Sequence, residues 1–268
     1  MGSIKNNSEN YILNYVPENH TQIVADARSL IKDYNFCIIK NFNNFDIQEK
    51  IYNFMEKRLS ESADIRVSGG FHYNMSDYCR LDIGDSYKNM RFSRYILFCE
   101  WNEPNKELFD EIQPLLSFRN AISDIKQDAE YRYDIGDNNL GSEACYCDVI
   151  RMIQYPVGGG FLSAHNDFDE TFYPGEMINV LLPITTRIKP NSKTNNRLQK
   201  FEKGGFYYFC NGNKIDVEEI VDSGDLIIHN QHIDHGVNSI DPDKNLDMNT
   251  LCGRVTLNFS IGKFNQET

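Results

Sequence analysis

The sequence contains no long hydrophobic run, and this absence excludes a membrane-spanning helix. Such a helix needs about 20 consecutive apolar residues, and no segment of the 268 residues comes near that length. The first residues, Met1 to Asn6, are polar and lack the apolar centre of a secretion signal. We therefore expect a soluble, cytoplasmic protein without a membrane partner.

Positive charge is also scarce. Lys and Arg number 27 against 39 Asp and Glu, which gives a formal net charge of −12. A general nucleic-acid-binding protein needs a basic face for the phosphates. Nucleic acid is therefore not expected as a partner, and the sequence does not indicate an oligomeric state.

Paired cysteines are almost missing. Of the seven cysteines, Cys145 and Cys147 form a close pair, and no second pair completes a zinc site. We interpret the cysteines as buried free thiols in a reducing compartment.

The first half of the chain, residues 1–143, mixes helical and strand patterns. Apolar residues recur every three or four positions in three segments, which predicts three amphipathic helices. The predicted helices cover residues 21–34, 46–59 and 104–125. Thr21 and Asp46 precede the first two apolar stripes and are the expected N-caps. Short apolar runs predict strands at 36–40 and 92–100.

Residues 69–89 are polar, aromatic and aperiodic. Long loops of this chemistry are often lids or binding loops. The alternative is a surface loop whose aromatic side chains only pack. If the segment is a lid, His72 and Arg80 are candidate substrate contacts.

From residue 144 onward, β-branched and aromatic runs alternate with turn signals such as Asn211-Gly212. The predicted strands cover 146–155, 177–184, 205–210, 225–229 and 253–261. Residues 188–203 look like an exposed insertion. We therefore predict a single α+β domain over residues 1–268, in which helices of the first half support a barrel or double-stranded sandwich formed by residues 144–264.

The segment from Gly158 to Asp167 carries the first chemical signal. It reads Gly-Gly-Gly-Phe-Leu-Ser-Ala-His-Asn-Asp. In an extended chain, His165 and Asp167 point to the same face, so the two side chains can bind one divalent metal ion. Alone, such a pair is a weak signal.

A third ligand is expected on a later strand. The segment Gly224–Val237 contains His229, His232 and His235. A glycine-aspartate turn leads into an apolar strand, and the chain then returns to a His-Gly-Val sequence. This favours His235 as the ligand, although either of the other two would replace it if the turn fell differently.

The ordered set of motifs resembles the iron(II)/2-oxoglutarate-dependent dioxygenases, in particular the prolyl-hydroxylase-like and phytanoyl-hydroxylase-like members. The resemblance covers residues 148–261. The motifs are Tyr155-Pro-x-Gly-Gly-Gly, His165-x-Asp167, Ile178-Asn-Val-Leu-Leu-Pro, Gly204-Gly-Phe-Tyr-Tyr, Gly224-Asp-Leu-Ile-Ile, His235-Gly-Val and Arg254-x-Thr256. One departure is the longer interval from His235 to Arg254, which makes residues 239–252 an inserted loop.

The resemblance implies a double-stranded β-helix, a jelly-roll or cupin-like barrel. It also implies iron(II) on His165, Asp167 and His235, with 2-oxoglutarate and dioxygen as cosubstrates. Two imidazoles and one carboxylate leave metal positions open, as expected for non-haem iron oxygenases. The expected cosubstrate contacts are Arg254, Tyr155, Thr256 and Asn179. Arg254 suits a carboxylate because a guanidinium grips it bidentately.

Two of these contacts have alternatives. The alternative role of Tyr155 is simple packing, and the alternative for Asn179 is a polar group on the other face of its strand. Arg151 lies four residues before Tyr155 in the same predicted strand, so its side chain should also face the barrel interior. A buried arginine there is costly unless it contacts an anion. We interpret it as a contact to a substrate carboxylate or phosphate, or as a salt-bridge partner of Asp169, itself a candidate substrate contact.

The predicted function is hydroxylation of an unactivated C–H bond in a small molecule, such as an amino acid or a natural-product intermediate, with release of succinate and CO2. Asp167 stands where the family's halogenating members have a small residue, so halogenation is not expected. The alternatives are a cupin-type barrel without 2-oxoglutarate chemistry, a structural metal site closed by His232 or Asp169, and a protein side-chain hydroxylase.

Overall fold

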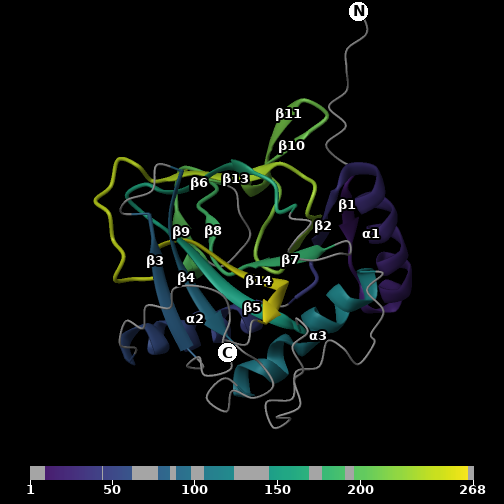
Figure 1. Ribbon diagram of the computed structural model, residues 1–268, viewed down its shortest axis with the longest axis horizontal. Helices are drawn as coiled ribbons and strands as arrows, with labels where there is room; N and C mark the ends of the chain where they lie inside the picture. Colours follow the sequence, from purple (N-terminus) through teal and green to yellow (C-terminus); the bar gives the residue numbers. More distant parts are fainter. Residues whose placement is uncertain are drawn as a thin grey trace, which may run out of the picture.

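The computed structural model describes residues 10–43, 45–61, 78–84, 89–97, 106–123, 145–168, 177–190 and 196–264. Strands dominate these ranges and form one large, mostly antiparallel sheet that curls into a barrel (Figure 1). No helix in the described ranges is both long and apolar enough to cross a bilayer.

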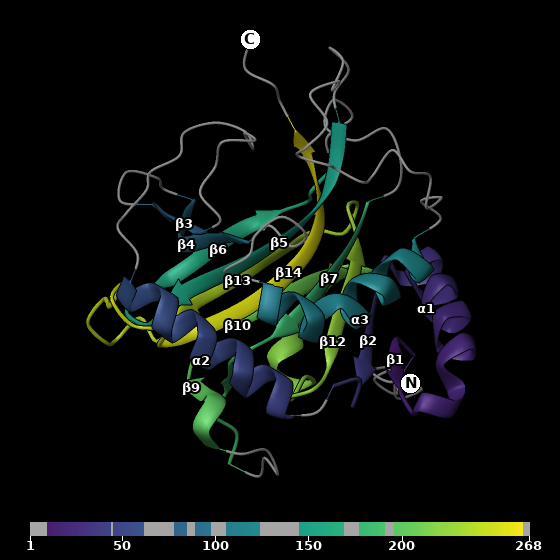
Figure 2. The ribbon, with the colours of Figure 1, turned by 90° about the horizontal axis from the view of Figure 1, so that it is seen from below.

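Three α-helices lie outside the barrel. They are α1 (His20–Tyr34), α2 (Phe45–Glu61) and α3 (Lys106–Ile122). Figure 2 shows α2 and α3 running across one face of the sheet, with α1 at its edge. Their positions agree with the three helices predicted from the apolar stripes.

The ends of α1 have local causes. Its buried residues Ile23, Ala27 and Ile31 recur every four positions and form the stripe that packs on the sheet. It ends at Asn35, which has a φ of 65° and donates its backbone N–H to the Ile31 carbonyl. The prediction of an N-cap at Thr21 was wrong. The helix starts one residue earlier because it continues a 3-10 turn over Pro17–Asn19.

Most strands follow one hydrogen-bonded path. In chain order the strands are β1 (Ile12–Asn14), β2 (Phe36–Lys40), β3 (Tyr78–Ile83), β4 (Met90–Leu97), β5 (Cys145–Pro156), β6 (Gly160–His165), β7 (Ile178–Pro183), β8 (Thr186–Arg187), β9 (Gln199–Phe201), β10 (Gly205–Cys210), β11 (Asn213–Asp216), β12 (Leu226–Asn230), β13 (His235–Ile240) and β14 (Gly253–Phe264). The spatial order along the path is β1-β2-β12-β7-β14-β5-β4-β6-β13-β10-β11, and β3 pairs with β4. Strands β8 and β9 form a separate two-stranded sheet.

Strand β4 joins two halves of this sheet, because it pairs with both β5 and β6. We call β1, β2, β12, β7, β14, β5 and β4 the major sheet, and β6, β13, β10 and β11 the minor sheet. Side chains from both halves line one cavity. The strands of the first half of the chain are therefore part of the barrel wall.

Alternation along the strands separates the two faces of the major sheet. On β14, Val255, Leu257 and Phe259 belong to the hydrophobic cluster that includes the helices. The residues between them, Arg254 and Thr256, line the cavity instead. Because successive strand residues point to opposite faces, one face carries the core and the other carries the polar groups.

The register between β5 and β14 fixes which polar groups meet. The two strands pair antiparallel over their whole lengths, with Arg254 opposite Tyr155 and Asn258 opposite Arg151. A slip of one residue would turn all four side chains toward the helices.

The structure corrects two sequence predictions. Part of the predicted loop 69–89 forms strand β3, which pairs with β4; Arg80 lies in it, opposite Tyr95. The predicted exposed insertion 188–203 contains the buried residues Leu198 and Phe201, and β9 pairs with β8.

The predicted insertion at 239–252 begins later than expected, because β13 continues to Ile240. The carboxylate of Asp241 accepts hydrogen bonds from the backbone N–H groups of Glu202 (2.9 Å) and Lys203 (2.7 Å). Further along, the Thr250 carbonyl accepts a hydrogen bond from the buried side chain of Gln154. The insertion is therefore tied to the barrel.

Gly253, the first residue of β14, should tolerate no side chain. Its φ is +118°, and a Cβ atom there would lie 2.2 Å from the Tyr155 carbonyl oxygen. We expect Gly253→Ala to lower the free energy of unfolding by more than about 2 kcal/mol, because it adds this overlap to a left-handed strain of about 1–2 kcal/mol. Urea unfolding followed by fluorescence measures the change.

Gly212 provides the matched control. Its φ is +77°, but no atom lies within 4 Å of an added Cβ. Gly212→Ala should therefore cost only about 1 kcal/mol. Equal losses in the two variants would contradict the close approach of Gly253 to Tyr155.

Candidate active site

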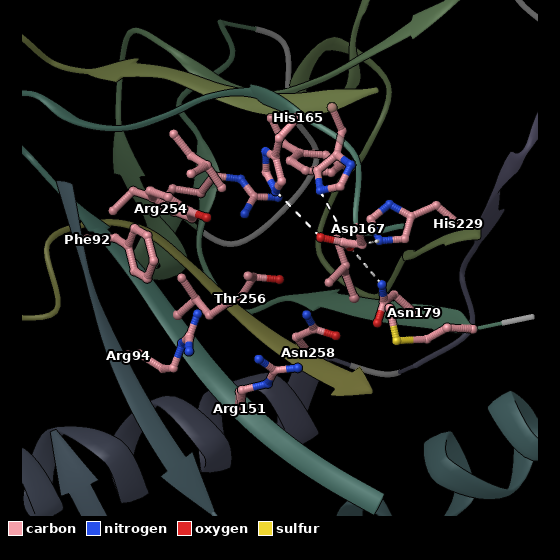
Figure 3. A pocket seen from close by; sticks show the side chains of 17 residues that line it. Phe92, Arg94, Arg151, His165, Asp167, Asn179, His229, Arg254, Thr256 and Asn258 are labelled. Carbon is pink, nitrogen blue, oxygen red and sulfur yellow. Dashed lines mark hydrogen bonds and ion pairs between the residues drawn. The ribbon is translucent and has the colours of Figure 1, made fainter. Parts of the chain in front are cut away.

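Three possible metal ligands converge at one end of the cavity. His165 ends β6 and His235 begins β13, and the two residues are directly paired across these strands. Asp167 follows two residues after His165, and its backbone N–H donates to the Gln231 carbonyl at 3.0 Å. One ligand atom from each of His165, Asp167 and His235 lies within 4.8 Å of the others. Figure 3 shows the side chains facing one another.

Backbone hydrogen bonds fix the tautomer of both histidines. His165 Nδ1 lies 3.0 Å from the Ser163 carbonyl, and His235 Nδ1 lies 3.0 Å from the Ile233 carbonyl. Since a carbonyl only accepts, each Nδ1 carries the proton. Each Nε2 therefore presents a lone pair to the site, 3.5 and 3.8 Å from the Asp167 carboxylate oxygens. Metal-binding histidines are commonly oriented in this way.

Asp167 is ionised although it is largely buried. Burial alone would raise its pKa, but the neighbouring imidazoles of His165, His235 and His229 hold the pKa well below its usual range. The nearby Asp167 carboxylate raises the pKa of His165, whereas burial lowers the pKa of His235. The site thus offers a carboxylate together with imidazoles.

Asn179 on β7 supports this carboxylate. Its Nδ2 donates to Asp167 Oδ2 at 3.0 Å, and its Oδ1 is buried without a hydrogen-bond partner. Asn179 lines the cavity, so it lies on the face expected from the sequence. Its predicted contact with 2-oxoglutarate stays a prediction, since the amide is at least partly used in orienting Asp167.

His229 is a further imidazole beside the three ligands. It is buried on β12, its Nδ1 lies 2.8 Å from the Tyr208 hydroxyl, and its Nε2 lies 3.9 Å from Asp167 Oδ2 without a hydrogen-bond partner. Burial lowers its pKa to about 3, so the ring is neutral. His232 is exposed and packs against the Phe168 ring. Neither belongs to the group of mutually close ligand atoms in the described residues.

Arg254 projects into the cavity from β14. It is 2% exposed, and its Nε donates to Glu218 Oε1 at 2.6 Å. Its guanidinium carbon lies 5.0 Å from the centre of the Phe206 ring. The atom Nη2 is buried and has no hydrogen-bond partner. One edge of the guanidinium is therefore held by Glu218, and a donor remains for a ligand.

The two other predicted cosubstrate contacts, Thr256 and Tyr155, use their hydroxyl groups differently. Thr256 Oγ1 donates to the Leu182 carbonyl at 3.2 Å, so this proton is used within the sheet. Tyr155 lines the cavity opposite Arg254. Burial raises its pKa to about 12 in spite of the nearby charges of Arg254 and Arg94. Its side chain is therefore a neutral phenol that can donate to an anion.

The cavity has a volume of about 300 Å³ and lies between the two sheets. It brings together most of the residues predicted from the sequence, namely His165, Asp167, His235, Arg254, Tyr155, Thr256, Asn179 and Arg151. His72 and Asp169 lie outside the described residues. For Arg80, the structure describes the backbone position in β3 and not the side chain.

Sequence reasoning missed several lining residues, most importantly Arg94, Asn258 and Phe206. Asn258 could have been found from the sequence, since it is an even number of residues from Arg254 and Thr256 in the same predicted strand and therefore points to the same face. Arg94 lies two residues after Phe92 in a predicted strand, so the two side chains point to the same face. The pairing of that strand with β5, however, joins residues almost 60 positions apart and is not visible in the sequence.

No family model and no curated protein sequence matches this chain. Solved structures do. A prolyl 4-hydroxylase from Pseudomonas putida aligns with 89% of this chain and 98% of its own, at 13% identity and a TM-score of 0.54. The chain has the prolyl hydroxylase fold. A prolyl hydroxylase from Trichoplax adhaerens, in complex with a hypoxia inducible factor peptide, covers 91% of both chains at 12% identity and a TM-score of 0.56.

These likenesses confirm the predicted double-stranded β-helix. In this prolyl hydroxylase fold, the barrel formed by the major and minor sheets encloses the cavity that contains His165, Asp167 and His235. The fold by itself leaves the activity open, so the function must be argued from the side chains.

The three-ligand arrangement can be tested by metal binding. We expect His235→Ala to weaken binding of Co²⁺ by more than about 100-fold, because even loss of a residue that orients a ligand costs about 10- to 100-fold. His229→Ala should change the affinity less than about 10-fold, since His229 is outside the ligand group. Titration followed by cobalt absorbance measures both.

His232→Ala is the control for this experiment, because His232 is exposed and three residues from His235. It should bind Co²⁺ as the unmodified protein does. If His229→Ala lost binding as completely as His235→Ala, the site would use four protein ligands, and a closed structural site would be the better interpretation.

Proposed function

We propose that this chain is an iron(II)- and 2-oxoglutarate-dependent dioxygenase that hydroxylates a C–H bond of a small molecule. In the overall reaction, the substrate C–H bond, 2-oxoglutarate and O2 give a C–OH bond, succinate and CO2. One oxygen atom enters the substrate and the other enters succinate. The observation that carries the proposal is the His165/Asp167/His235 cluster in the same cavity as the buried Arg254.

The residues of the cluster fit iron(II). Two neutral imidazole nitrogens and one carboxylate oxygen make the two-histidine, one-carboxylate donor set of non-haem iron oxygenases. The carbonyls of Ser163 and Ile233 orient the imidazoles, and Asn179 orients the carboxylate. When bound, iron(II) supplies open coordination positions at which the keto acid and dioxygen react.

Arg254 fits the distal carboxylate of 2-oxoglutarate. A buried guanidinium with one unpartnered nitrogen calls for a further hydrogen-bond acceptor, such as a carboxylate oxygen, since an unsatisfied buried donor is costly. Glu218 and the Phe206 ring keep the guanidinium in one orientation. Tyr155 adds a phenol on the opposite strand, and Thr256 adds a hydroxyl oxygen on the same strand. We propose all three as cosubstrate contacts.

Asp167 supports hydroxylation rather than halogenation, because the carboxylate occupies the position that halogenating relatives leave open for chloride. Asn179 holds this carboxylate at 3.0 Å. A small-molecule substrate is favoured by the cavity volume of about 300 Å³, which is at the lower end of the range for small-ligand sites.

A protein side chain is the second candidate substrate. One of the similar structures is a prolyl hydroxylase in complex with a peptide. The two candidates differ in which compounds stimulate succinate formation, free small molecules or peptides.

Succinate formation tests the proposed reaction. Purified protein with iron(II), ascorbate, 2-oxoglutarate and candidate substrates should release succinate, measured by mass spectrometry. His165→Ala should reduce the rate by more than about 100-fold, because it removes a metal ligand. His232→Ala should retain the rate. Absence of succinate from the unmodified protein with every candidate substrate would contradict the proposal.

The role of Arg254 needs paired variants, because removing one member of a buried ion pair strands the other charge. Glu218→Gln removes a charge while it keeps an acceptor for the Phe206 N–H, and the KM for 2-oxoglutarate should stay within about threefold. Adding Arg254→Gln should raise this KM by about 10- to 100-fold, which corresponds to the free energy of a hydrogen bond to a charged group. Initial succinate rates give both constants.

An unchanged KM in the Glu218→Gln/Arg254→Gln double variant would exclude Arg254 as the cosubstrate contact. It would favour a cupin-type enzyme that works without 2-oxoglutarate, since such an enzyme has no need of this arginine.

A further inference from the structure

His229 is a polar residue of the cavity that the proposed function does not use. It lies on β12, is 2% exposed, and lines the cavity. Its Nε2 has no hydrogen-bond partner among the described residues. It lies 3.9 Å from Asp167 Oδ2, which is too far for a hydrogen bond. Since a buried polar group without a partner is costly, this atom calls for a ligand.

The hydrogen bond at the other ring nitrogen shows which tautomer His229 adopts. Nδ1 lies 2.8 Å from the hydroxyl of the buried Tyr208, and this is the hydroxyl's only hydrogen bond in the described part of the chain. If Nδ1 carried the proton, the hydroxyl would accept it, and the hydroxyl's own proton would be buried without an acceptor. The satisfied arrangement therefore has Tyr208 donating to Nδ1 and the imidazole proton on Nε2.

The Asp167 carboxylate supports the same assignment. A lone pair on Nε2 would face the negative Oδ2, whereas an N–H directs its positive end toward that oxygen. His229 therefore has the opposite tautomer to His165 and His235, whose protons are on Nδ1. A protonated Nε2 has no lone pair for a metal ion, so His229 presents a hydrogen-bond donor. The neutral tautomer and the cation share this donor.

Asn179 places an acceptor beside this donor. The two residues are directly opposite in the antiparallel pair of β7 and β12, a relation in which Cβ atoms are about 4.5–5.5 Å apart. Asn179 Nδ2 donates to Asp167 at 3.0 Å, so the remaining amide atom is Oδ1, which is buried without a hydrogen-bond partner among the described residues. One donor and one acceptor thus lie side by side on the cavity wall.

The cosubstrates cannot use both of these groups. Figure 3 shows His229 and Asn179 on one side of Asp167 and Arg254, the proposed 2-oxoglutarate contact, on the other. At neutral pH both carboxyl groups of 2-oxoglutarate are ionised, so 2-oxoglutarate and dioxygen have only acceptor atoms. Neither can donate to Asn179 Oδ1. The primary substrate is the reactant that can bring a donor to this place.

We propose that His229 and Asn179 form a subsite for the primary substrate, and that the substrate group bound there is a neutral hydroxyl or carboxamide. Such a group accepts a hydrogen bond from His229 Nε2 and donates one to Asn179 Oδ1. A carboxylate would satisfy His229, but it would bring its negative charge against the Asn179 oxygen and Asp167. The anchored group holds the neighbouring C–H bonds of the substrate beside the metal ligands.

Tyr208 is a positioning residue in this subsite, because its hydroxyl keeps the proton of His229 on Nε2. The inference rests on the proposed oxygenase function and names the substrate class of that site, a small molecule with a neutral group that both donates and accepts.

Four probes of equal size test the subsite without turnover. Acetamide and 2-propanol both donate and accept hydrogen bonds, whereas acetone and acetate only accept. Protein loaded with Mn²⁺ and saturated with 2-oxoglutarate is titrated with each probe, and NMR follows the paramagnetic relaxation of the probe's methyl protons. Zn²⁺-loaded protein gives the diamagnetic background. We expect acetamide or 2-propanol to bind at least about threefold more tightly than acetone and acetate, the value of one neutral hydrogen bond. Preference between the first two tells carboxamide from hydroxyl.

Variants assign the donor. His229→Phe/Tyr208→Phe removes the imidazole and its partner together, so that no buried hydroxyl is left unpaired. It should weaken binding of the favoured probe about 3- to 10-fold, while the Kd of 2-oxoglutarate, measured by calorimetry, stays within about twofold. His229→Gln can place an amide N–H near the position of Nε2 and should lose less binding. His232→Phe makes the matched substitution at an exposed position and should leave both constants unchanged.

Three results would overturn the proposal. In the first, no probe shows metal-dependent relaxation with the unmodified protein, or acetone binds as tightly as acetamide and 2-propanol. In the second, the His229→Phe/Tyr208→Phe variant binds the favoured probe with unchanged Kd. In the third, this variant loses more affinity for 2-oxoglutarate than for the probe, which would assign the His229 donor to the cosubstrate.

Succinate assays on the same preparations separate this proposal from the proposed function. If the unmodified protein forms succinate but binds no probe, the subsite fails and the oxygenase function stands. If it forms no succinate with any candidate substrate, the oxygenase function fails. The titration, repeated without 2-oxoglutarate, then still shows whether His229 and Asn179 bind a neutral polar group.

Discussion

The strict alternation of side chains along β5 and β14 is the constraint on which the rest of the structure depends. These strands pair over their full lengths in the middle of the major sheet. One face of β14 supplies core residues beneath the helices, and the other supplies Arg254, Thr256 and Asn258 to the cavity. Burying the apolar face is what fixes the register, because a slip of one residue would exchange the two faces. Core formation and site formation are therefore one event.

The cavity contains charges that a barrel interior would ordinarily exclude, and each described charge near the ligands has a local compensation. Asp167 is surrounded by imidazoles and the Asn179 amide. Arg254 shares its Nε with Glu218, which comes from the turn after β11 and is itself 1% exposed. Such pairs add little to stability, since desolvation offsets the attraction. Their effect is to hold polar groups in one orientation before any ligand binds, which suits a site that must align several reactants.

The sequence alone was sufficient to predict the features that a local residue pattern encodes. Strand 205–210 and the helix that ends near Tyr34 could be placed because apolar periodicity is a short-range signal. The His165-x-Asp167 pair and the Arg254 strand could be placed for the same reason. The position of β3 was missed although Cys79, Leu81 and Ile83 alternate with polar residues, because this short run lies in an aperiodic segment and is held by pairing with β4. Arg94 was missed for a related reason, since its relation to Arg151 exists only across the β4–β5 ladder. Glu218 has no sequence signal at all, because its partner is 36 residues away.

The cavity that contains the unpartnered Nη2 of Arg254 lies inside a protein with a formal net charge of −12, and this contrast has a kinetic consequence. An approaching anion first meets the repulsive field of the whole molecule. It meets the attraction of Arg254 only near the cavity, since fields are screened over about 8 Å at physiological ionic strength. Added salt weakens the outer repulsion more than the direct contacts made within the cavity. Association of anionic ligands should therefore become faster with ionic strength, the opposite of enzymes whose surface charge steers the substrate inward.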